Sequence, residues 1–239
     1  MVSQLAMGMV AFLPAVAILY AYIGPHDKHF RHNAMFMVLV GSLALGLAAG
    51  FAELFIITDA GLLLVVFALP LVETMAKTML VGLPRFRGRA ETVLLGGAVG
   101  LGTAAMIFMT YAQVIRMEPD SWRLWTTLVA VSIGFTLTHF ISGLMLGQGP
   151  AEGKVLGQFL SSYLILLPAH GLLIWLGLAQ GLAYQPFVNY NSIEIGLLLA
   201  AYGVLLTWRM AGPLIRLGLP AQEKARMRRE ARAERMKEA

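Results

Sequence analysis

The chain has 239 residues, of which 58% are hydrophobic and 13% are charged, and its formal net charge is +5. Soluble domains carry about 25% charged residues, so this composition excludes an ordinary soluble domain and indicates an integral membrane protein. Cysteine is absent, which excludes disulfides, thiolate metal sites and a cysteine nucleophile.

Long apolar stretches follow one another along the chain. A helix needs about 20 apolar residues to cross a hydrocarbon core of ~30 Å. The first stretch has no preceding basic segment and no small-residue cleavage site, so we expect a retained span and not a signal peptide. We expect an all-α, polytopic membrane helix bundle over residues 1–215 and a basic cytoplasmic helical tail over residues 216–239. Seven stretches have the required length, approximately 3–23, 34–57, 60–83, 92–115, 123–147, 155–183 and 194–215.

Basic residues concentrate in every second connection between these stretches. The positive-inside rule then places the amino terminus outside and the carboxyl terminus in the cytoplasm, as an odd number of spans requires. We therefore expect a multi-pass protein of the cell membrane, surrounded by the lipid bilayer. The basic connections contain Lys28 and Arg31, then Arg85, Arg87 and Arg89, then Lys154, and finally the cluster that begins at Arg216.

The tail sequence "AQEKARMRREARAERMKEA" holds seven basic and four acidic residues. Its residue types favour a helix, but no apolar stripe is present for burial. We expect a solvated helix held near an anionic leaflet, where each basic residue adds about 1 kcal/mol of attraction. Docking onto a cytoplasmic protein partner or onto RNA remains an alternative.

Small residues recur at four-residue spacing in three of the stretches. Such pairs let helix backbones approach closely in a membrane, and they predict a compact bundle. The pairs are Gly46 and Gly50, Gly96 and Gly100, and Gly143 and Gly147.

Ionisable residues inside the third stretch need an explanation, because each costs at least ~2.5 kcal/mol at such depth and is normally paired or functional. Glu73 and Lys77 are four residues apart in the order that favours an ion pair on one helix face. A purely structural pair is one hypothesis and a functional site is the other. We interpret Glu53, near the outer end of the second stretch, as a structural residue that reaches towards the headgroups.

Two histidines lie at depth in other stretches. His139 is expected ~12 Å and His170 ~22 Å from the inner ends of their helices, at ~1.5 Å per residue. With Glu73 they could hold a water for general-base chemistry, bind a metal through two nitrogens and an oxygen, or ligate a haem. Because the expected depths differ by ~10 Å, we expect neither a bis-histidine haem nor a tight metal site, and no cofactor.

Four segments resemble motifs of a known family. "LPLVETMAK" is similar to an apolar-Pro-EExxK segment, "GGAVGLGTAAMIF" to a Gly-rich GLGFA segment, "FTLTHFISGLMLG" to an FxxxH motif, and "LLPAHGLLIWL" to a final histidine motif. In this order they resemble a divergent member of the PrsW-type intramembrane proteases, related to the CAAX prenyl endopeptidase and bacterial abortive-infection (CPBP) membrane proteins.

The resemblance implies catalytic roles for Glu73, His139 and His170 in activating a water for peptide hydrolysis within the membrane. It leaves Lys77 and Thr74 as ion-pair or substrate positions. Thr74 replaces the second motif glutamate, and Ile174 stands where an Asn or Asp is expected. Ile107 and Phe108 replace the glutamate-asparagine of the Gly-rich helix.

Two hypotheses of function therefore remain open. In the first, the chain is a reduced glutamate endopeptidase that cleaves a membrane protein or peptide. In the second, it is an inactive pseudoprotease that serves as a scaffold or as a subunit of a membrane complex.

Overall fold

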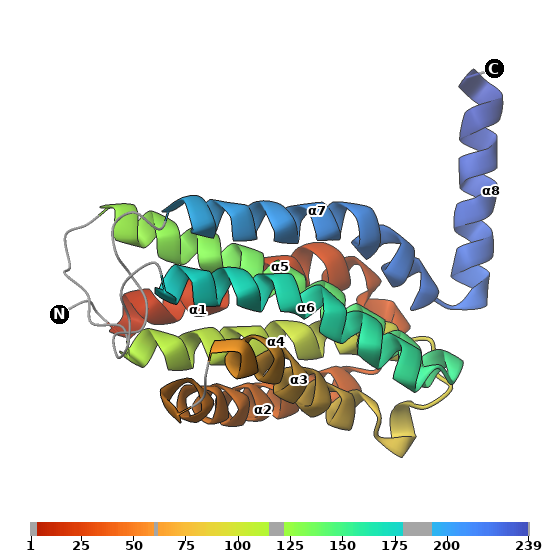
Figure 1. Cartoon of the computed structure of the whole chain (residues 1–239). Helices are drawn as coiled ribbons and strands as arrows, with labels where there is room; N and C mark the ends of the chain where they lie inside the picture. The colour runs from red at the N-terminus through yellow and green to blue at the C-terminus, as the bar shows by residue number, and fades with distance from the viewer. Residues whose placement is uncertain (1–3, 60–61, 115–121, 179–192, 239) are drawn as a thin grey trace.

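The computed structural model describes residues 4–59, 62–114, 122–178 and 193–238 (Figure 1). Over these ranges it contains eight α-helices and no strand, which confirms the predicted all-α class. A π-helical turn, Leu19–Ile23, and two 3₁₀ segments, Gly24–His29 and Pro84–Phe86, extend the connections. The α-helices are α1 (Gln4–Ile18), α2 (His32–Asp59), α3 (Leu62–Val81), α4 (Thr92–Val114), α5 (Trp122–Glu152), α6 (Val155–Leu178), α7 (Ile193–Leu217) and α8 (Ala221–Glu238).

Six helices in the described part of the chain are long and apolar enough to cross a membrane. They are α2, α4, α5, α6, α7, and α1 together with the turns that follow it. The remaining predicted span is α3, the helix that carries both Glu73 and Lys77. These helices indicate a multi-pass membrane protein, and the count of seven spans stays a prediction.

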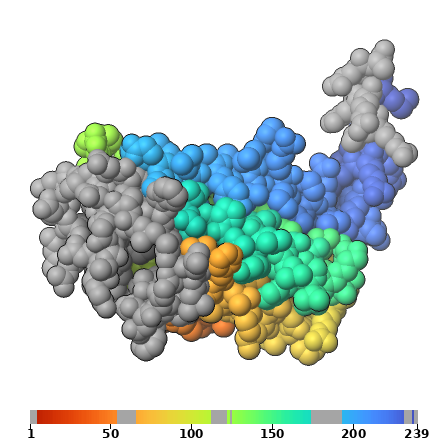
Figure 2. Space-filling view, viewed as in Figure 1, coloured from red at the N-terminus to blue at the C-terminus, as the bar shows by residue number. Residues whose placement is uncertain are grey.

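Helices α4 and α5 form the centre of the bundle. In each, 89% of the residues in the most apolar window are buried, against 22–39% in the other four. Helix α4 packs against α5 and α2, while α5 also packs against α7 and α6. Helix α3 lies against α6 and α2. Figure 2 shows α6 and α7 side by side on one face of the bundle.

The predicted glycine pairs are the contacts between the central helices. A Cβ at Gly96 or Gly100 of α4 would overlap the α5 backbone at Gly143 or His139. A Cβ at Gly46 of α2 would lie 2.6 Å from the Thr103 carbonyl oxygen of α4. The prediction of a compact bundle is therefore confirmed, because the missing side chains allow these backbones to touch.

The connections alternate between the two ends of the bundle. Residues 24–31, 82–91 and 153–154 lie at the same end as the start of α8 (Figure 1). Helix α5 ends at Glu152, five residues later than predicted, because Gly153 adopts φ +74° and terminates it there.

Helix α8 leaves the bundle after α7 and points away from it (Figure 1). The Lys224 ammonium donates a 2.9 Å hydrogen bond to the Leu217 carbonyl oxygen at the end of α7. This hydrogen bond caps the carboxyl end of α7 at its junction with α8. Most side chains of α8 are exposed.

Candidate functional site

Glu73 is the centre of a buried polar cluster contributed by several helices. Its Oε1 atom lies 3.0 Å from Nε2 of His170 on α6, and its Oε2 atom lies 3.1 Å from Nε2 of His139 on α5. Lys77 on α3 approaches the same Oε2 atom at 3.6 Å. None of these four residues is more than 1% exposed. The structure therefore brings together Glu73, Lys77 and both histidines.

The depth expected for His139 is wrong, and the length of α5 is the reason. His139 lies 13 residues before Glu152, or about 20 Å at ~1.5 Å per residue. His170 lies 15 residues after Val155, or about 22 Å. The two imidazoles are therefore level, with ring centroids 6.2 Å apart. The argument against a tight metal site, which relied on different depths of the two histidines, therefore fails. The Glu73 carboxylate nevertheless lies between the two imidazoles, and both Nε2 atoms face it.

Lys77 determines which nitrogen of His139 faces Glu73. Its Nζ atom lies 3.0 Å from Nδ1 of His139. An ammonium group has donors and no acceptor, so Nδ1 accepts and the ring proton is on Nε2, which faces Glu73. The Phe135 ring, one helical turn earlier, packs 4.1 Å from the His139 ring centroid and holds the imidazole in place.

His170 has a different pair of partners. Its Nδ1 atom lies 3.0 Å from the Leu166 carbonyl oxygen, which can only accept. Nδ1 therefore carries a proton and donates it. The contact between Nε2 and Oε1 of Glu73 then requires one more proton, held on either atom.

Glu53 joins the cluster from α2, so the expectation that it reaches the headgroups is wrong. Its side chain has no exposed surface. The Tyr111 hydroxyl of α4 donates a hydrogen bond to its Oε2 atom, and the carboxyl group lies within electrostatic reach of Glu73 and Lys77. The sequence held one signal for this position, because Gly46, Gly50 and Glu53 share a helix face and the two glycines pack against α4.

Three buried polar atoms of the cluster lack a well-aligned hydrogen bond to the described part of the chain. They are Oε1 of Glu53, Oε2 of Glu73 and Nε2 of His139. The last two lie 3.1 Å apart with poor alignment. Buried water molecules typically bind about three such groups, so water is the expected partner of these atoms.

Glu73, His139 and His170 also place one potential metal-ligand atom each within 4.8 Å of one another. Two histidines and a glutamate suit Zn²⁺. A metal-ligating histidine, however, normally donates its second N–H to an acceptor. His170 does so to Leu166, whereas His139 receives the Lys77 ammonium. As arranged, the cluster fits a hydrogen-bonded proton site and does not fit a metal centre.

The positions at which the chain departs from the family motifs are apolar or internally bonded. The Thr74 hydroxyl donates a 2.6 Å hydrogen bond to the Pro70 carbonyl oxygen, so it does not reach the carboxylate cluster. Ile107 and Phe108 are buried in a hydrophobic cluster with Phe135. Ile174 lies in α6, and its side chain falls outside the described part of the chain.

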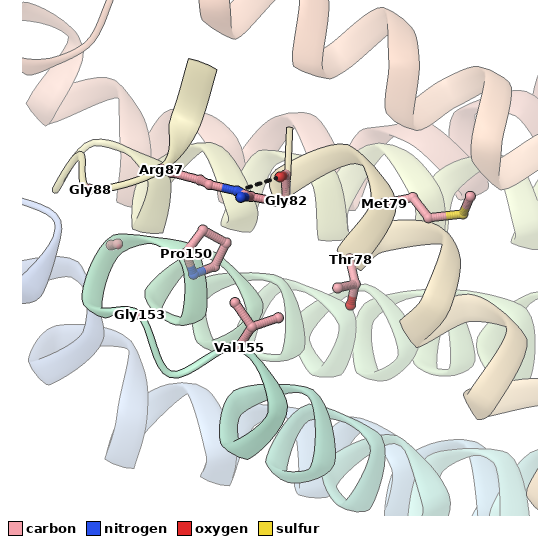
Figure 3. Close-up of a pocket in the computed structure, with 9 residues that line it drawn as sticks. Thr78, Met79, Gly82, Arg87, Gly88, Pro150, Gly153 and Val155 are labelled. Atoms are coloured by element: carbon pink, nitrogen blue, oxygen red, sulfur yellow. Dashed lines mark hydrogen bonds between the residues drawn. The ribbon is translucent and has the colours of Figure 1, made fainter. Parts of the chain in front are cut away.

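A groove of about 730 Å³ lies at the carboxyl-terminal end of α3, apart from the buried cluster (Figure 3). Thr78, the residue after Lys77, borders it, and Pro150 and Val155 of the α5–α6 turn form the facing wall. Arg87 reaches across its rim and donates a 3.3 Å hydrogen bond to the Gly82 carbonyl oxygen. The groove is thus a mainly apolar surface with one guanidinium group.

Comparison of the chain with protein-family models, with curated proteins and with solved structures gave no match. The class of protein therefore follows from the chain itself. Over the described residues it is all-helical, with six helices suited to a membrane and a buried, multi-helix cluster of two carboxyl groups, two imidazoles and an ammonium group.

Proposed function

We propose that the chain is a PrsW-like intramembrane endopeptidase of the glutamate type, with a membrane protein or membrane-inserted peptide as substrate. The observation that carries the proposal is the position of the Glu73 carboxylate between two imidazole nitrogens, at 3.0 and 3.1 Å, on helices distant in sequence. Ionisable groups inside membrane helices usually mark functional sites. This supports the hypothesis of a functional site more than that of a simple ion pair.

In the proposed reaction Glu73 is the general base. Its Oε2 atom lacks a well-aligned hydrogen bond to the described part of the chain, so a water hydrogen-bonded there would lie within the 2.6–3.2 Å reach that proton transfer needs. The Nε2–H group of His139 then stabilises the negative oxygen that forms when the water attacks a peptide carbonyl. Lys77 holds the tautomer of His139 that makes this donation available.

The proposal includes a topology of seven spans with the amino terminus outside and the carboxyl terminus in the cytoplasm. The connections with the predicted basic clusters gather at the end of the bundle from which α8 emerges (Figure 1). The positive-inside rule assigns that end to the cytoplasm. The groove of Figure 3 then faces the cytoplasmic leaflet. Its border residue Thr78 is five residues from Glu73, or about 7.5 Å along α3, which suits a substrate that approaches from this side.

A second candidate function is that of a pseudoprotease scaffold or complex subunit. It is favoured by Ile107 and Phe108, which place buried hydrocarbon where the family has a glutamate and an asparagine. Ile174 also stands where the resemblance implies an oxyanion donor, and losing one such donor typically lowers a rate by 10²–10³.

Glu73→Gln tests the proposal directly. The wild-type chain and the variant are expressed in matched cells, and new peptide termini in the membrane proteome are counted by mass spectrometry. We expect termini that depend on the wild-type chain and disappear with Glu73→Gln, while both proteins are extracted as folded species. Glu194→Gln, an exposed carboxylate on α7, is the matched control and should cleave as the wild type does. Identical termini in wild type and Glu73→Gln would refute the endopeptidase, and the scaffold function would remain. Loss of folding in Glu73→Gln would favour a structural ion pair.

A further inference from the structure

The groove of Figure 3 has walls that backbone and side-chain hydrogen bonds hold in place. The Gly88 N–H donates a 3.0 Å hydrogen bond to the Pro150 carbonyl oxygen, which attaches the loop after α3 to the end of α5. Phe86 of the same loop is fully buried, and its carbonyl oxygen accepts a 2.6 Å hydrogen bond from the Thr92 hydroxyl. The groove is therefore preformed, and its volume of about 730 Å³ falls in the range of about 300–1,000 Å³ found for small-molecule sites.

Arg87 lies between these two anchored residues and carries a charge that the groove does not compensate. Its Nε atom donates a 3.3 Å hydrogen bond to the Gly82 carbonyl oxygen across the rim. The two Nη groups have no hydrogen bond or ion pair with any residue that the structure describes. They are therefore available to an anionic ligand. Nearby cations that do form ion pairs are Arg31 and Arg89, both with Glu91, and Lys154, with Glu152.

The remainder of the groove is mainly hydrocarbon. Met79 and Val155 line it and are 73% and 43% exposed. The Thr78 hydroxyl already donates a 2.7 Å hydrogen bond to the Thr74 carbonyl oxygen. Figure 3 shows Thr78 and Met79 at the end of the groove opposite to Gly153. A ligand that matches this surface has an anionic group for the guanidinium and hydrocarbon for the other side chains.

The position of the groove in the bundle indicates where such a ligand comes from. The groove joins the last turn of α3, which ends at Val81, to the loop that carries Arg87. This end of the bundle also holds the basic connections (Figure 1). At the end of a membrane helix the hydrocarbon core meets the lipid headgroups. A phospholipid supplies both parts there, and a guanidinium fork matches the geometry of phosphate oxygens.

We propose that the groove is a binding site for one anionic phospholipid. The lipid phosphate accepts hydrogen bonds from the Nη groups of Arg87, whose guanidinium the Gly82 carbonyl oxygen orients, and an acyl chain lies along Met79 and Val155. The site goes beyond the proposed function and does not depend on it, because it uses no residue of the buried cluster. A membrane substrate that approaches past Thr78 would meet this lipid first.

Native mass spectrometry of the full chain in detergent tests the proposal with two probes, dioleoyl phosphatidylglycerol and dioleoyl phosphatidylcholine. We expect the wild type to bind one phosphatidylglycerol more tightly than phosphatidylcholine, because only the former is anionic. Arg87→Gln should weaken phosphatidylglycerol binding at least about tenfold, the effect expected when a hydrogen bond between charged groups is lost. Arg87 is exposed, so this variant should fold.

Arg85→Gln is the matched control, since it removes the same charge from the same loop. Arg85 lies over the Phe86 ring, 5.4 Å from its centroid, and is not part of the groove lining. It should leave phosphatidylglycerol binding unchanged. The basic residues of α8 are present in every variant, so their attraction for anionic lipid cancels in the comparison. Equal affinities of the wild type and Arg87→Gln, or an equal loss in Arg85→Gln, would overturn the proposal.

The hydrocarbon part of the site has its own test. Val155→Trp places a larger side chain in the groove and should weaken phosphatidylglycerol binding, whereas Leu156→Trp changes the next residue, which is exposed outside the lining, and should not. Glycerophosphoglycerol, the same headgroup without acyl chains, should bind much more weakly than the lipid. If it binds as tightly, the site holds a free phosphate compound and the lipid proposal is wrong. Equal binding of phosphatidylcholine and phosphatidylglycerol to the wild type would also refute it.

Discussion

Nζ of Lys77 lies 3.0 Å from Nδ1 of His139, which is 62 residues later in the chain. The same ammonium lies 3.6 Å from Oε2 of Glu73 on its own helix. Lys77 therefore has two tasks that the i, i+4 spacing does not reveal: it compensates the carboxylate, and it fixes the tautomer of a histidine on α5. Both tasks keep α3 attached to the centre of the bundle.

Lys77→Met should destabilise the fold strongly. It leaves Glu73 with less positive charge around it and Nδ1 of His139 without a donor, and removing one partner of a buried ion pair costs about 3–5 kcal/mol. Reversible unfolding in mixed detergent micelles measures the change. The control is Lys154→Met, which breaks an exposed ion pair with Glu152 and should change the free energy of unfolding very little.

The double variant Glu73→Gln with Lys77→Met separates the pair from its surroundings. Because it removes both charges, we expect it to lose less stability than the sum of the two single variants. Strict additivity would show that the two side chains do not interact and would contradict the ion pair.

Tyr111→Phe should lower stability by about 1–3 kcal/mol, the cost of leaving a buried polar atom without its hydrogen bond. The atom concerned is Oε2 of Glu53, which the hydroxyl contacts. Tyr163→Phe removes a 3.3 Å hydrogen bond to the Phe67 carbonyl oxygen at an exposed position and serves as the comparison. Equal, small effects of the two substitutions in unfolding experiments would show that Glu53 does not depend on Tyr111.

Gly100→Ala should disrupt both packing and site. Its Cβ would overlap the backbone carbonyl of His139, so α4 and α5 must separate, and such overpacking costs typically 1–3 kcal/mol. We expect a lower unfolding midpoint together with weaker cleavage, since His139 moves with α5. Gly212→Ala, where a Cβ meets nothing within 4 Å, should leave both unchanged. A Gly100→Ala protein as stable as Gly212→Ala would mean that the two helices pack less closely than described.

The tail prediction concerns electrostatics. The segment "AQEKARMRREARAERMKEA" carries seven basic and four acidic residues, and α8 leaves the bundle with its side chains largely exposed. We expect a peptide of this sequence to bind vesicles that contain phosphatidylserine and to dissociate as salt rises, because the Debye length falls from ≈ 10 Å at 0.1 M to ≈ 3 Å at 1 M. Vesicle sedimentation measures it. Equal binding to neutral vesicles would instead indicate a partner other than an anionic lipid.

The sequence allowed much of the fold to be predicted. Long apolar stretches specify membrane-length helices, since a buried backbone in lipid must satisfy its own hydrogen bonds, and the all-α class followed. Glycine spacing predicted close helix contacts that the structure contains. Helix ends were less predictable: α5 continues through Pro150 to Glu152, and a shift of five residues was enough to misplace His139.

The candidate site was also predictable only in part. Glu73, His139 and His170 stood out because an ionisable side chain in an apolar stretch is costly wherever its helix packs. That these three residues face each other depended on the rotation and relative height of their helices. The apolar pattern of one helix does not reveal how it is placed against another. Glu53 was misplaced for this reason, since Tyr111, which donates to it, is 58 positions away in sequence.

The sequence by itself thus determined the lipid environment, the helices and the ionisable residues whose burial is costly, because these depend on composition and local spacing. Only the tertiary structure decided the tautomer of His139, the proton on Nδ1 of His170 and the hydrogen bond from Tyr111 to Glu53. The physical reason is that hydrogen bonds need a donor and an acceptor about 3 Å apart. Such distances are set by how α2, α3, α4, α5 and α6 pack, and not by any one of them.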